Sequence, residues 1–264
     1  MIFTLVIEFF FIFKAMKKFL SLLLVILIFT NGFTQDSSGR KSIYKFRLGV
    51  EIPIGALCAG TGITSLILHK KKAPLTLQDI NNLKVSDVNK FDRYAIYQHS
   101  KAAAISSDIF QYTAIVSPAL LFIDKDIRRD WKTVLPIWME TFALTSTLTM
   151  FTKELAKRNR PYVYSDYDNG NKYSKDARSS FWSGHTAITA SSTYFIAMVY
   201  SDYHPNSRWK PLVWTGAAIL PALTAITRVK AGKHYWTDVI TGYAVGALVG
   251  TLTPFLHRRE FRKK

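Results

Sequence analysis

Three short strings of the chain bring together the residue types that could attack a phosphate ester. They lie between apolar segments, in this order along the chain: Lys153-x6-Arg160-Pro161, Ser183-Gly184-His185 and Arg228-x5-His234-x3-Asp238. Cations can hold phosphate oxygens, an imidazole can act as nucleophile or acid, and a carboxylate can fix which imidazole nitrogen is protonated. The residue types and their spacing therefore indicate phosphoryl chemistry.

The third string carries the most chemistry. His234 and Asp238 stand four residues apart, so on a helix they share one face, and the carboxylate can hold the imidazole in one tautomer. That pairing is typical of an oriented nucleophile or base, although a solvated His/Asp pair has the same spacing. Arg228, six residues before His234, adds a fork of donors suited to two phosphate oxygens.

The other two strings predict anion-binding groups at helix ends. Lys153 and Arg160 are seven residues apart, about two helical turns, and Pro161 is expected to end their helix. Ser183 precedes an apolar run and can cap a helix, which leaves backbone N–H groups near Gly184 free to bind an anion. Taken singly, each string also fits a charge capping an apolar segment or a plain helix start.

Together the strings resemble the signature of the type 2 phosphatidic acid phosphatase (PAP2) superfamily, which reads K-x6-R-P, P-S-G-H and S-R-x5-H-x3-D. That superfamily also includes bacterial acid phosphatases and vanadium haloperoxidases. The resemblance covers roughly residues 105 to 256. The chain departs from the signature at Trp182, where the family usually has proline, and at Thr227, where it usually has serine. Neither position is charged or nucleophilic, so the departures bear on substrate fit more than on the chemistry.

The resemblance implies a role for each residue of the strings. His234 would be the nucleophile that forms a phosphohistidine, Asp238 would orient its other nitrogen, and His185 would protonate the leaving alcohol and then activate water. The implied phosphate-binding residues are Lys153, Arg160, Ser183, Gly184 and Arg228. No metal or other cofactor is implied, because three fixed cations supply the charge that Mg²⁺ supplies in other phosphoryl-transfer sites.

Six apolar stretches predict an all-α fold, a six-helix PAP2-type bundle embedded in a membrane. They lie near 47–68, 107–123, 134–152, 186–200, 212–227 and 239–256, and most approach the roughly 20 residues that cross a bilayer. We divide the chain into a signal peptide or anchor (1–35, with 1–15 as an upstream extension), an N-terminal helix with an amphipathic surface segment (36–104), the phosphatase core (105–256) and a basic tail (257–264).

Composition narrows the classes of function. The 264 residues carry a formal net charge of +17, but the basic residues are spread over loops between apolar runs. An anionic membrane surface or substrate therefore fits better than nucleic acid. Cys58 is the single cysteine, so an internal disulfide is excluded. Two lysines and the apolar run 19–30 predict a signal peptide cut near Thr34, with an uncleaved anchor as the alternative.

Basic residues also predict the orientation in the membrane. They gather at 125–132, at 208–210 and in the tail 258–264, which the positive-inside tendency places in the cytoplasm. Both catalytic loops then face the periplasm, with the inner membrane favoured over the outer. Six crossings would put 36–46 in the cytoplasm, whereas a cleaved signal would leave them outside. We therefore expect the 47–68 stretch, which holds Glu51, Pro53 and four glycines, not to cross fully.

Small and acidic residues inside the apolar stretches predict how the helices pack. Gly242, Gly246 and Gly250 repeat every four residues, the pattern that lets two helices approach closely in lipid. Acidic residues at such depth usually face the bundle interior. We expect structural pairing for those found here: Glu51, Asp108 and Glu140.

Two polar segments are expected at the mouth of the site. Residues 69–104 have apolar positions spaced for short amphipathic helices that form a rim, and the three lysines at 70–72 are expected to be a solvated charge run. The 162–171 segment contains Tyr162, Tyr164 and Tyr167, and is expected to shape substrate entry.

The favoured function is hydrolysis of a lipid phosphate or diphosphate monoester, with lipid substrate and membrane lipids as the partners. One alternative is an exported, soluble, non-specific acid phosphatase, in which the apolar stretches would be core helices. A lower-ranked alternative is a non-catalytic binder of anionic lipid. The combination of His185, His234 and Asp238 argues against the binder, because a simple anion site needs no oriented imidazole.

Overall fold

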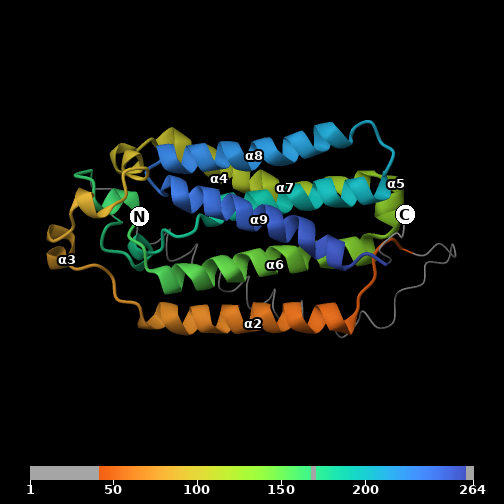
Figure 1. Ribbon diagram of the computed structural model, residues 1–264, viewed down its shortest axis with the longest axis horizontal. Helices are drawn as coiled ribbons and strands as arrows, with labels where there is room; N and C mark the ends of the chain where they lie inside the picture. The colour runs from red at the N-terminus through yellow and green to blue at the C-terminus, as the bar shows by residue number, and fades with distance from the viewer. Residues whose placement is uncertain (1–41, 168–170, 260–264) are drawn as a thin grey trace.

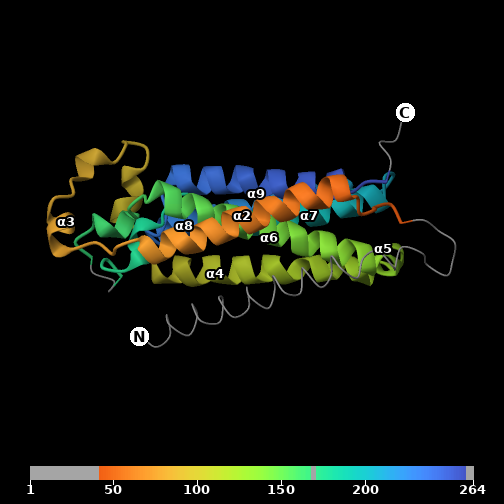
Figure 2. The same cartoon turned by 90° about the horizontal axis from the view of Figure 1, so that it is seen from below.

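The computed structural model describes residues 42–167 and 171–259, where the regular structure is helical apart from one isolated β-bridge. Six long helices lie side by side along the long axis of the molecule (Figures 1 and 2): α2 (Leu48–Lys71), α4 (Lys101–Val116), α6 (Trp131–Ala156), α7 (Gly184–Tyr203), α8 (Lys210–Lys230) and α9 (Trp236–Leu256). The predicted all-α bundle of six helices is thus confirmed. The signal or anchor at 1–35 lies outside the described residues.

Short helices complete the connections between the long ones. Two are α-helical: α3 (Leu77–Asn81) and α5 (Lys125–Arg129). Five are 3₁₀ helices: η2 (Val85–Asp87), η3 (Arg93–Tyr97), η4 (Ser117–Ile123), η5 (Pro161–Val163) and η6 (Lys175–Arg178). The segment from α3 to η3 is the predicted run of short helices, and it lies over one end of the bundle (Figure 1).

Local backbone chemistry sets the helix ends that matter for the site. Ser183 caps α7 as predicted, since its Oγ accepts a hydrogen bond from the Thr186 N–H at 3.4 Å. The end of α6 differs from the prediction, because the helix stops at Ala156, well before Pro161. Lys157 turns into the left-handed region with φ of 45°, and its N–H closes the last turn on the Lys153 carbonyl. Lys153 and Arg160 therefore do not share one helix.

Helix α7 is the centre of the bundle. It packs against α4, α6, α8 and α9, while α2 packs on the outside of α6 (Figure 2). Several of its hydroxyls bond to backbone carbonyls, as Ser192 does within α7 and Thr193 does across to Ala217 of α8, whereas the buried Thr189 hydroxyl has no such partner. A polar central helix can be buried because the bonded hydroxyls are satisfied internally.

The glycine row of α9 lies directly on the backbone of α7. A Cβ at Gly242 would stand 2.6 Å from the carbonyl oxygen of Ser183, one at Gly246 would stand 2.1 Å from that of Ala187, and one at Gly250 would meet Ser191 at 2.4 Å. Both helices advance by four residues along this contact. The predicted small-residue packing is confirmed, and its partner is α7.

We expect Gly246→Ala to destabilise the protein by about 3 kcal/mol or more, because the added methyl meets a backbone carbonyl that no side-chain rotation can move away. The matched control is Gly216→Ala in α8, where nothing lies within 4 Å of the added methyl. That change is expected to be neutral or slightly stabilising, since alanine is the better helix former. Thermal unfolding in detergent measures both. Equal midpoints for Gly246→Ala and the wild type would contradict this packing.

Four helical segments of the described chain are long and apolar enough to cross a membrane: Leu48–Lys71, Trp131–Val163, Lys210–Lys230 and Trp236–Leu256. Large apolar side chains on their outer faces are exposed, among them Ile52, Ile63, Leu212, Ile219 and Leu248. Such an apolar exterior suits contact with lipid. The chain is a membrane protein.

The two ends of the bundle hold different segments of the chain. We call the end that holds 125–132, 204–210 and Arg258 the basic end, and the opposite end, where α6 and α8 finish and α7 and α9 begin, the site end (Figure 1). Tyr44 lies at the basic end, where it forms the β-bridge with Arg258 and donates to Asp202 at 2.7 Å. The expectation that 47–68 stops short is not supported, because α2 is one continuous helix of 24 residues that reaches the site end.

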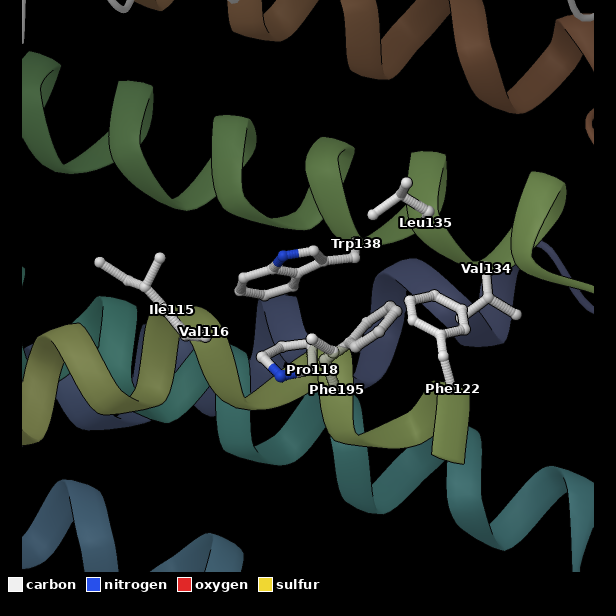
Figure 3. A pocket seen from close by; sticks show the side chains of 9 residues that line it. Ile115, Val116, Pro118, Phe122, Val134, Leu135, Trp138 and Phe195 are labelled. Atoms are coloured by element: carbon white, nitrogen blue, oxygen red, sulfur yellow. The ribbon is translucent and has the colours of Figure 1, made fainter. Parts of the chain in front are cut away.

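An apolar pocket of about 200 Å³ opens on the side of the bundle, between α6 and the α4–η4 segment (Figure 3). The residues that line it are Ile115, Val116, Pro118, Ala119, Phe122, Val134, Leu135, Trp138 and Phe195. It contains none of the predicted site residues and lies toward the basic end.

Candidate active site

The site end places all eight predicted residues on neighbouring helix ends. Lys153 is in the last turn of α6, Arg160 follows that helix, and Ser183, Gly184 and His185 begin α7. Arg228 is in the last turn of α8, His234 lies just before α9, and Asp238 is in the first turn of α9, so the predicted pair does not share the face of one helix. Strings that are far apart in sequence are thus neighbours in the fold.

His234 is held by both of its ring nitrogens. The ring is 1% exposed, and Nδ1 lies 2.8 Å from the Ser180 carbonyl oxygen. A carbonyl can only accept, so Nδ1 carries the proton and Nε2 keeps its lone pair. Nε2 lies 3.1 Å from Nη1 of Arg160, whereas the Asp238 carboxylate is 3.5 Å from Nδ1. The direct partner of Nδ1 is therefore Ser180, which differs from the role expected for Asp238.

Asp238 acts on the histidine through its surroundings. Its buried carboxylate accepts from the Ser180 hydroxyl, from the Tyr235 N–H at 3.0 Å and from Arg158. Its backbone carbonyl accepts from the Ser183 N–H at 3.0 Å. Asp238 thus fixes the residue that holds His234, and it ties the start of α9 to the start of α7.

A glycine turn aims His234 into the site. Gly232 has φ of 64°, and a Cβ there would stand 1.9 Å from the Gln98 carbonyl oxygen. Only glycine fits both the left-handed conformation and this close approach. The turn lets the chain leave α8 and enter α9 within a few residues, with His234 facing Arg160.

Arg160 is a buried cation fixed by three groups. Nε donates to the Asp176 carbonyl at 3.0 Å, Nη2 donates to the Asp176 carboxylate at 2.8 Å, and Nη1 donates to the Lys233 carbonyl at 3.0 Å. Burial opposes the ionised form of Asp176, but Arg160 and then Lys153 outweigh it and hold the pKa of that carboxyl well below its usual range. The guanidinium is therefore oriented before any ligand binds.

Arg228 and His185 share one acidic partner. The Asp108 carboxylate lies 2.8 Å from Nε2 of His185 and 3.4 Å from Nη1 of Arg228, and Ser107 accepts from the same Nη1 at 3.1 Å. Because a carboxylate accepts, Nε2 of His185 carries a proton. Structural pairing was the expected role of Asp108, and the pairing takes place inside the site.

Lys153 faces the start of α7. Its Nζ lies 3.8 Å from where a Cβ on Gly184 would stand, and no hydrogen-bond partner for Nζ is found among the described residues. The Ser183 hydroxyl is buried and lies 3.0 Å from Oγ1 of Thr186, within the first turn. A cation beside the N-terminus of a long helix is an arrangement that favours an anion.

The electrostatics favour a neutral imidazole at His234. Burial lowers the pKa of His234 well below its usual value, and the positive charges of Arg160, Arg228 and Lys153 lower it further, with His185 contributing. His234 is therefore uncharged near neutral pH, and its Nε2 faces cations that would also bind a phosphate.

Arg158 is a residue of the site that the sequence analysis did not predict. Its Nη2 pairs with Asp92 at 2.7 Å, its Nη1 bonds Thr237 and Asp238, and its guanidinium covers the Tyr235 ring at 4.1 Å. Asp92 is fully buried and accepts from the N–H and hydroxyl of Thr237. It thereby caps α9 from a distant segment.

Two other expectations at the site end need correction. Lys72 is not solvated but 4% exposed, and its Nζ bonds Glu154 at 2.8 Å and Ser179 at 2.7 Å. Tyr162 is buried in an apolar cluster instead of lining an entry loop. Tyr167 does lie at the surface, stacked on His99, whereas residues 168–170 lie outside the described part of the chain.

Comparisons with known proteins agree with this geometry. Residues 135–262 match the model of the PAP2 superfamily. Phospholipid phosphatase 1 of Rattus norvegicus is 29% identical over 99 residues, which are 34% of this chain and 35% of that protein. A putative phosphatidate phosphatase of Drosophila melanogaster is 34% identical over 85 residues, 28% of this chain and 20% of that protein. The segment 135–262 is therefore similar to the PAP2 superfamily, and the matches to the curated relatives span about a third or less of each relative.

A solved structure gives a further comparison. The crystal structure of the first transmembrane PAP2 type phosphatidylglycerolphosphate phosphatase from Bacillus subtilis is 20% identical to this chain with a TM-score of 0.48. The match covers 79% of this chain and all of that chain.

Proposed function

We propose that this protein is a metal-independent phosphatase that hydrolyses a lipid phosphate or diphosphate monoester through a phosphohistidine. The observation that carries the proposal is the state of His234: Nδ1–H is committed to the Ser180 carbonyl, and the Nε2 lone pair faces Arg160. An imidazole held in one tautomer beside buried cations is prepared to attack a phosphorus atom.

The chemistry proceeds in two balanced steps. Nε2 of His234 attacks phosphorus and forms a P–N bond, while the bond from phosphorus to the leaving oxygen breaks and that oxygen takes the Nε2 proton of His185, which acts from its doubly protonated form and becomes neutral. Water then attacks the phosphohistidine, His185 accepts a proton from that water, and the P–N bond breaks to release phosphate. In the free enzyme the His185 proton is donated to Asp108, so substrate would take the place of that contact.

The cations would stabilise the charge that develops on the transferring group. Arg160 and Arg228 are buried and held by other groups, and Lys153 lies beside Gly184. Because these donors are already oriented, little reorganisation is needed during the reaction, and such preorganisation is often the largest catalytic contribution.

Lipid is the substrate class that the bundle supports best. The site lies at the ends of helices whose exposed outer faces are apolar, so a substrate anchored in the bilayer could present its phosphate there. The relatives named above are phospholipid and phosphatidate phosphatases. A soluble acid phosphatase would leave these apolar faces in water, and a binder without turnover would not need the fixed tautomer.

The positive-inside tendency places the basic end in the cytoplasm and the catalytic loops in the periplasm, at the inner membrane. Residues 42–46 lie at the basic end, beside Arg258. An uncleaved anchor is compatible with that position, whereas cleavage near Thr34 would leave these residues on the other side.

Phosphate release from purified protein tests the function. The panel should contain phosphatidate, phosphatidylglycerophosphate, an isoprenyl diphosphate, lipid A and a soluble aryl phosphate. Turnover of at least one lipid supports the proposal. Turnover of the soluble ester alone would favour the acid phosphatase, and binding of lipid without release would favour the binder.

We expect initial rates to be unchanged in excess chelator, because protein cations supply the charge that a metal would otherwise provide. We expect vanadate to inhibit, since it can adopt the five-coordinate geometry of the transferring phosphorus and so bind as a transition-state analogue. Rates with and without chelator, and a vanadate titration, measure both. A loss of activity that is restored only by adding a divalent ion to a folded sample would contradict the cation-only site.

A further inference from the structure

A buried polar trio at the basic end takes no part in the chemistry above. Glu51 comes from α2, Glu140 comes from α6, and His257 directly follows α9. Their exposed fractions are 9%, 8% and 0%, and one candidate ligand atom from each lies within 4.8 Å of the others. Sequence analysis predicted interior pairing for both glutamates, and that prediction is confirmed.

The hydrogen bonds of the trio leave one acceptor unsatisfied. Nδ1 of His257 lies 2.8 Å from the Thr253 carbonyl oxygen, so Nδ1 carries a proton. Nε2 faces two carboxylates, with Oε1 of Glu51 at 3.0 Å and Oε2 of Glu140 at 3.1 Å. A single N–H cannot serve both, and Oε2 of Glu140 is buried without any hydrogen-bond partner.

The surroundings do not neutralise the two carboxylates. They lie beside an apolar cluster from the same three helices, which includes Ile54, Ala143 and Val249. Two basic side chains of the same end bond to other groups: Nη2 of Arg47 donates to backbone carbonyls of the C-terminal segment, and Arg258 pairs with Asp202. With both carboxylates ionised, the trio carries two negative charges when the histidine is neutral and one when the histidine is doubly protonated. Uncompensated charge in such a place is strongly unfavourable.

We propose that Glu51, Glu140 and His257 bind one divalent transition-metal ion such as Zn²⁺ or Mn²⁺. A mixed set of imidazole and carboxylate ligands suits these ions. Bonds of about 2.0–2.2 Å place neighbouring ligand atoms about 3 Å apart, which agrees with the distances from Nε2 to the two carboxylates. Donation of the other ring N–H to a backbone carbonyl is the usual arrangement of a metal-binding histidine, and the ion makes the trio neutral.

The ion has a structural role in this arrangement. It joins the first turn of α2 to α6 and to the end of α9, whereas α2 otherwise packs mainly on α6. Helix α9 has 21 residues, about 30 Å of rise, between this trio and the end that carries His234. The ion is therefore remote from the phosphoryl chemistry, and the inference does not depend on the proposed function.

The first test is the metal content of the full-length protein, purified in detergent with a histidine-free tag and without chelator. Elemental mass spectrometry should find about one Zn²⁺ or Mn²⁺ per chain, and Glu140→Gln should lose at least nine-tenths of it. The matched control is His204→Ala, which removes a basic-end histidine that has a single carboxylate partner, Asp124 at 3.0 Å. That variant should keep the ion.

The second test needs no variant. Wild-type protein stripped with chelator should unfold at a lower temperature, and Zn²⁺ or Mn²⁺ at a large excess over its Kd should raise the midpoint by about 10 °C. Phosphate release by the stripped sample at 25 °C should stay at the wild-type rate. The shift of the unfolding midpoint and the rate of phosphate release are thus measured separately.

Two results would overturn the inference. One is a wild-type protein that contains no stoichiometric ion and shows no shift of its midpoint with either Zn²⁺ or Mn²⁺. The other is a Glu140→Gln variant that is folded and retains the ion. In either case the trio would be a proton-sharing pair of carboxylates around a charged histidine.

Discussion

His234→Ala is expected to lower phosphate release by at least about 10⁴-fold while the protein stays folded, and His185→Ala is expected to do nearly the same. The size of the loss follows from the proposed mechanism, in which the two imidazoles act as a unit, one forming the bond to phosphorus and the other protonating the leaving oxygen. The double variant should therefore be little worse than either single one. Initial rates on the best lipid of the panel measure the loss, and thermal unfolding confirms that each variant is folded.

The matched control for these variants is His204→Ala. His204 also pairs with a carboxylate, but it lies at the basic end and contacts no site residue. The His204→Ala variant should turn over substrate at the wild-type rate. If His234→Ala turned over substrate at a rate within tenfold of wild type, His234 would not be the nucleophile.

Arg160→Lys is expected to lower kcat/KM by about 10³-fold, although the positive charge is kept. The arginine uses Nε and Nη2 on Asp176 and Nη1 on Lys233 and His234, a fork that an ammonium cannot reproduce. Loss of one oriented donor at a developing charge typically costs about 10²–10³ in rate. The remainder is expected from a less well-held His234.

The same substitution at an exposed arginine separates charge from geometry. Arg129 has a side chain that is 64% exposed, with a loose 3.8 Å pair to Asp126 at the basic end, and Arg129→Lys should be indistinguishable from wild type. If Arg160→Lys also kept wild-type kcat/KM, the fixed guanidinium would have no part in holding the transferring phosphate.

Much of the architecture could be predicted because it depends on the regular spacing of apolar and small residues along the chain. Apolar stretches of helical length predicted six helices. Glycines at every fourth position predicted the face of α9 that packs closely on a neighbouring helix. The three strings contain the groups that meet at the site end, since each one stands at a helix end and helix ends are where a bundle gathers side chains.

The contacts that orient the site could not be predicted, because they join segments with no shared pattern. The Ser180 carbonyl that holds His234 is a backbone group, to which no side-chain motif points. Asp92 and Arg158 lie 66 residues apart and meet only after the fold has formed. Neither residue is one of the positions that define the three strings.

The expectations that failed have a common physical origin. Lys72 follows two exposed lysines, but it turns inward because Glu154, a buried carboxylate, requires a cation. Tyr162 directly follows Pro161 in η5, and packing against Leu75 and Val163 buries it. In both cases the tertiary partner, and not the local composition, decided the exposure.

The central claim is that Nε2 of His234 becomes covalently bonded to phosphorus. Mixing enzyme and substrate rapidly, quenching in alkali to preserve the acid-labile P–N bond, and mapping the phosphate by mass spectrometry tests it directly. We predict phosphate on His234 in the wild type, with more of it in His185→Ala if that variant still undergoes the first step, and none on this peptide in His234→Ala. Turnover without a phosphorylated His234, or phosphate trapped on another residue, would contradict the account.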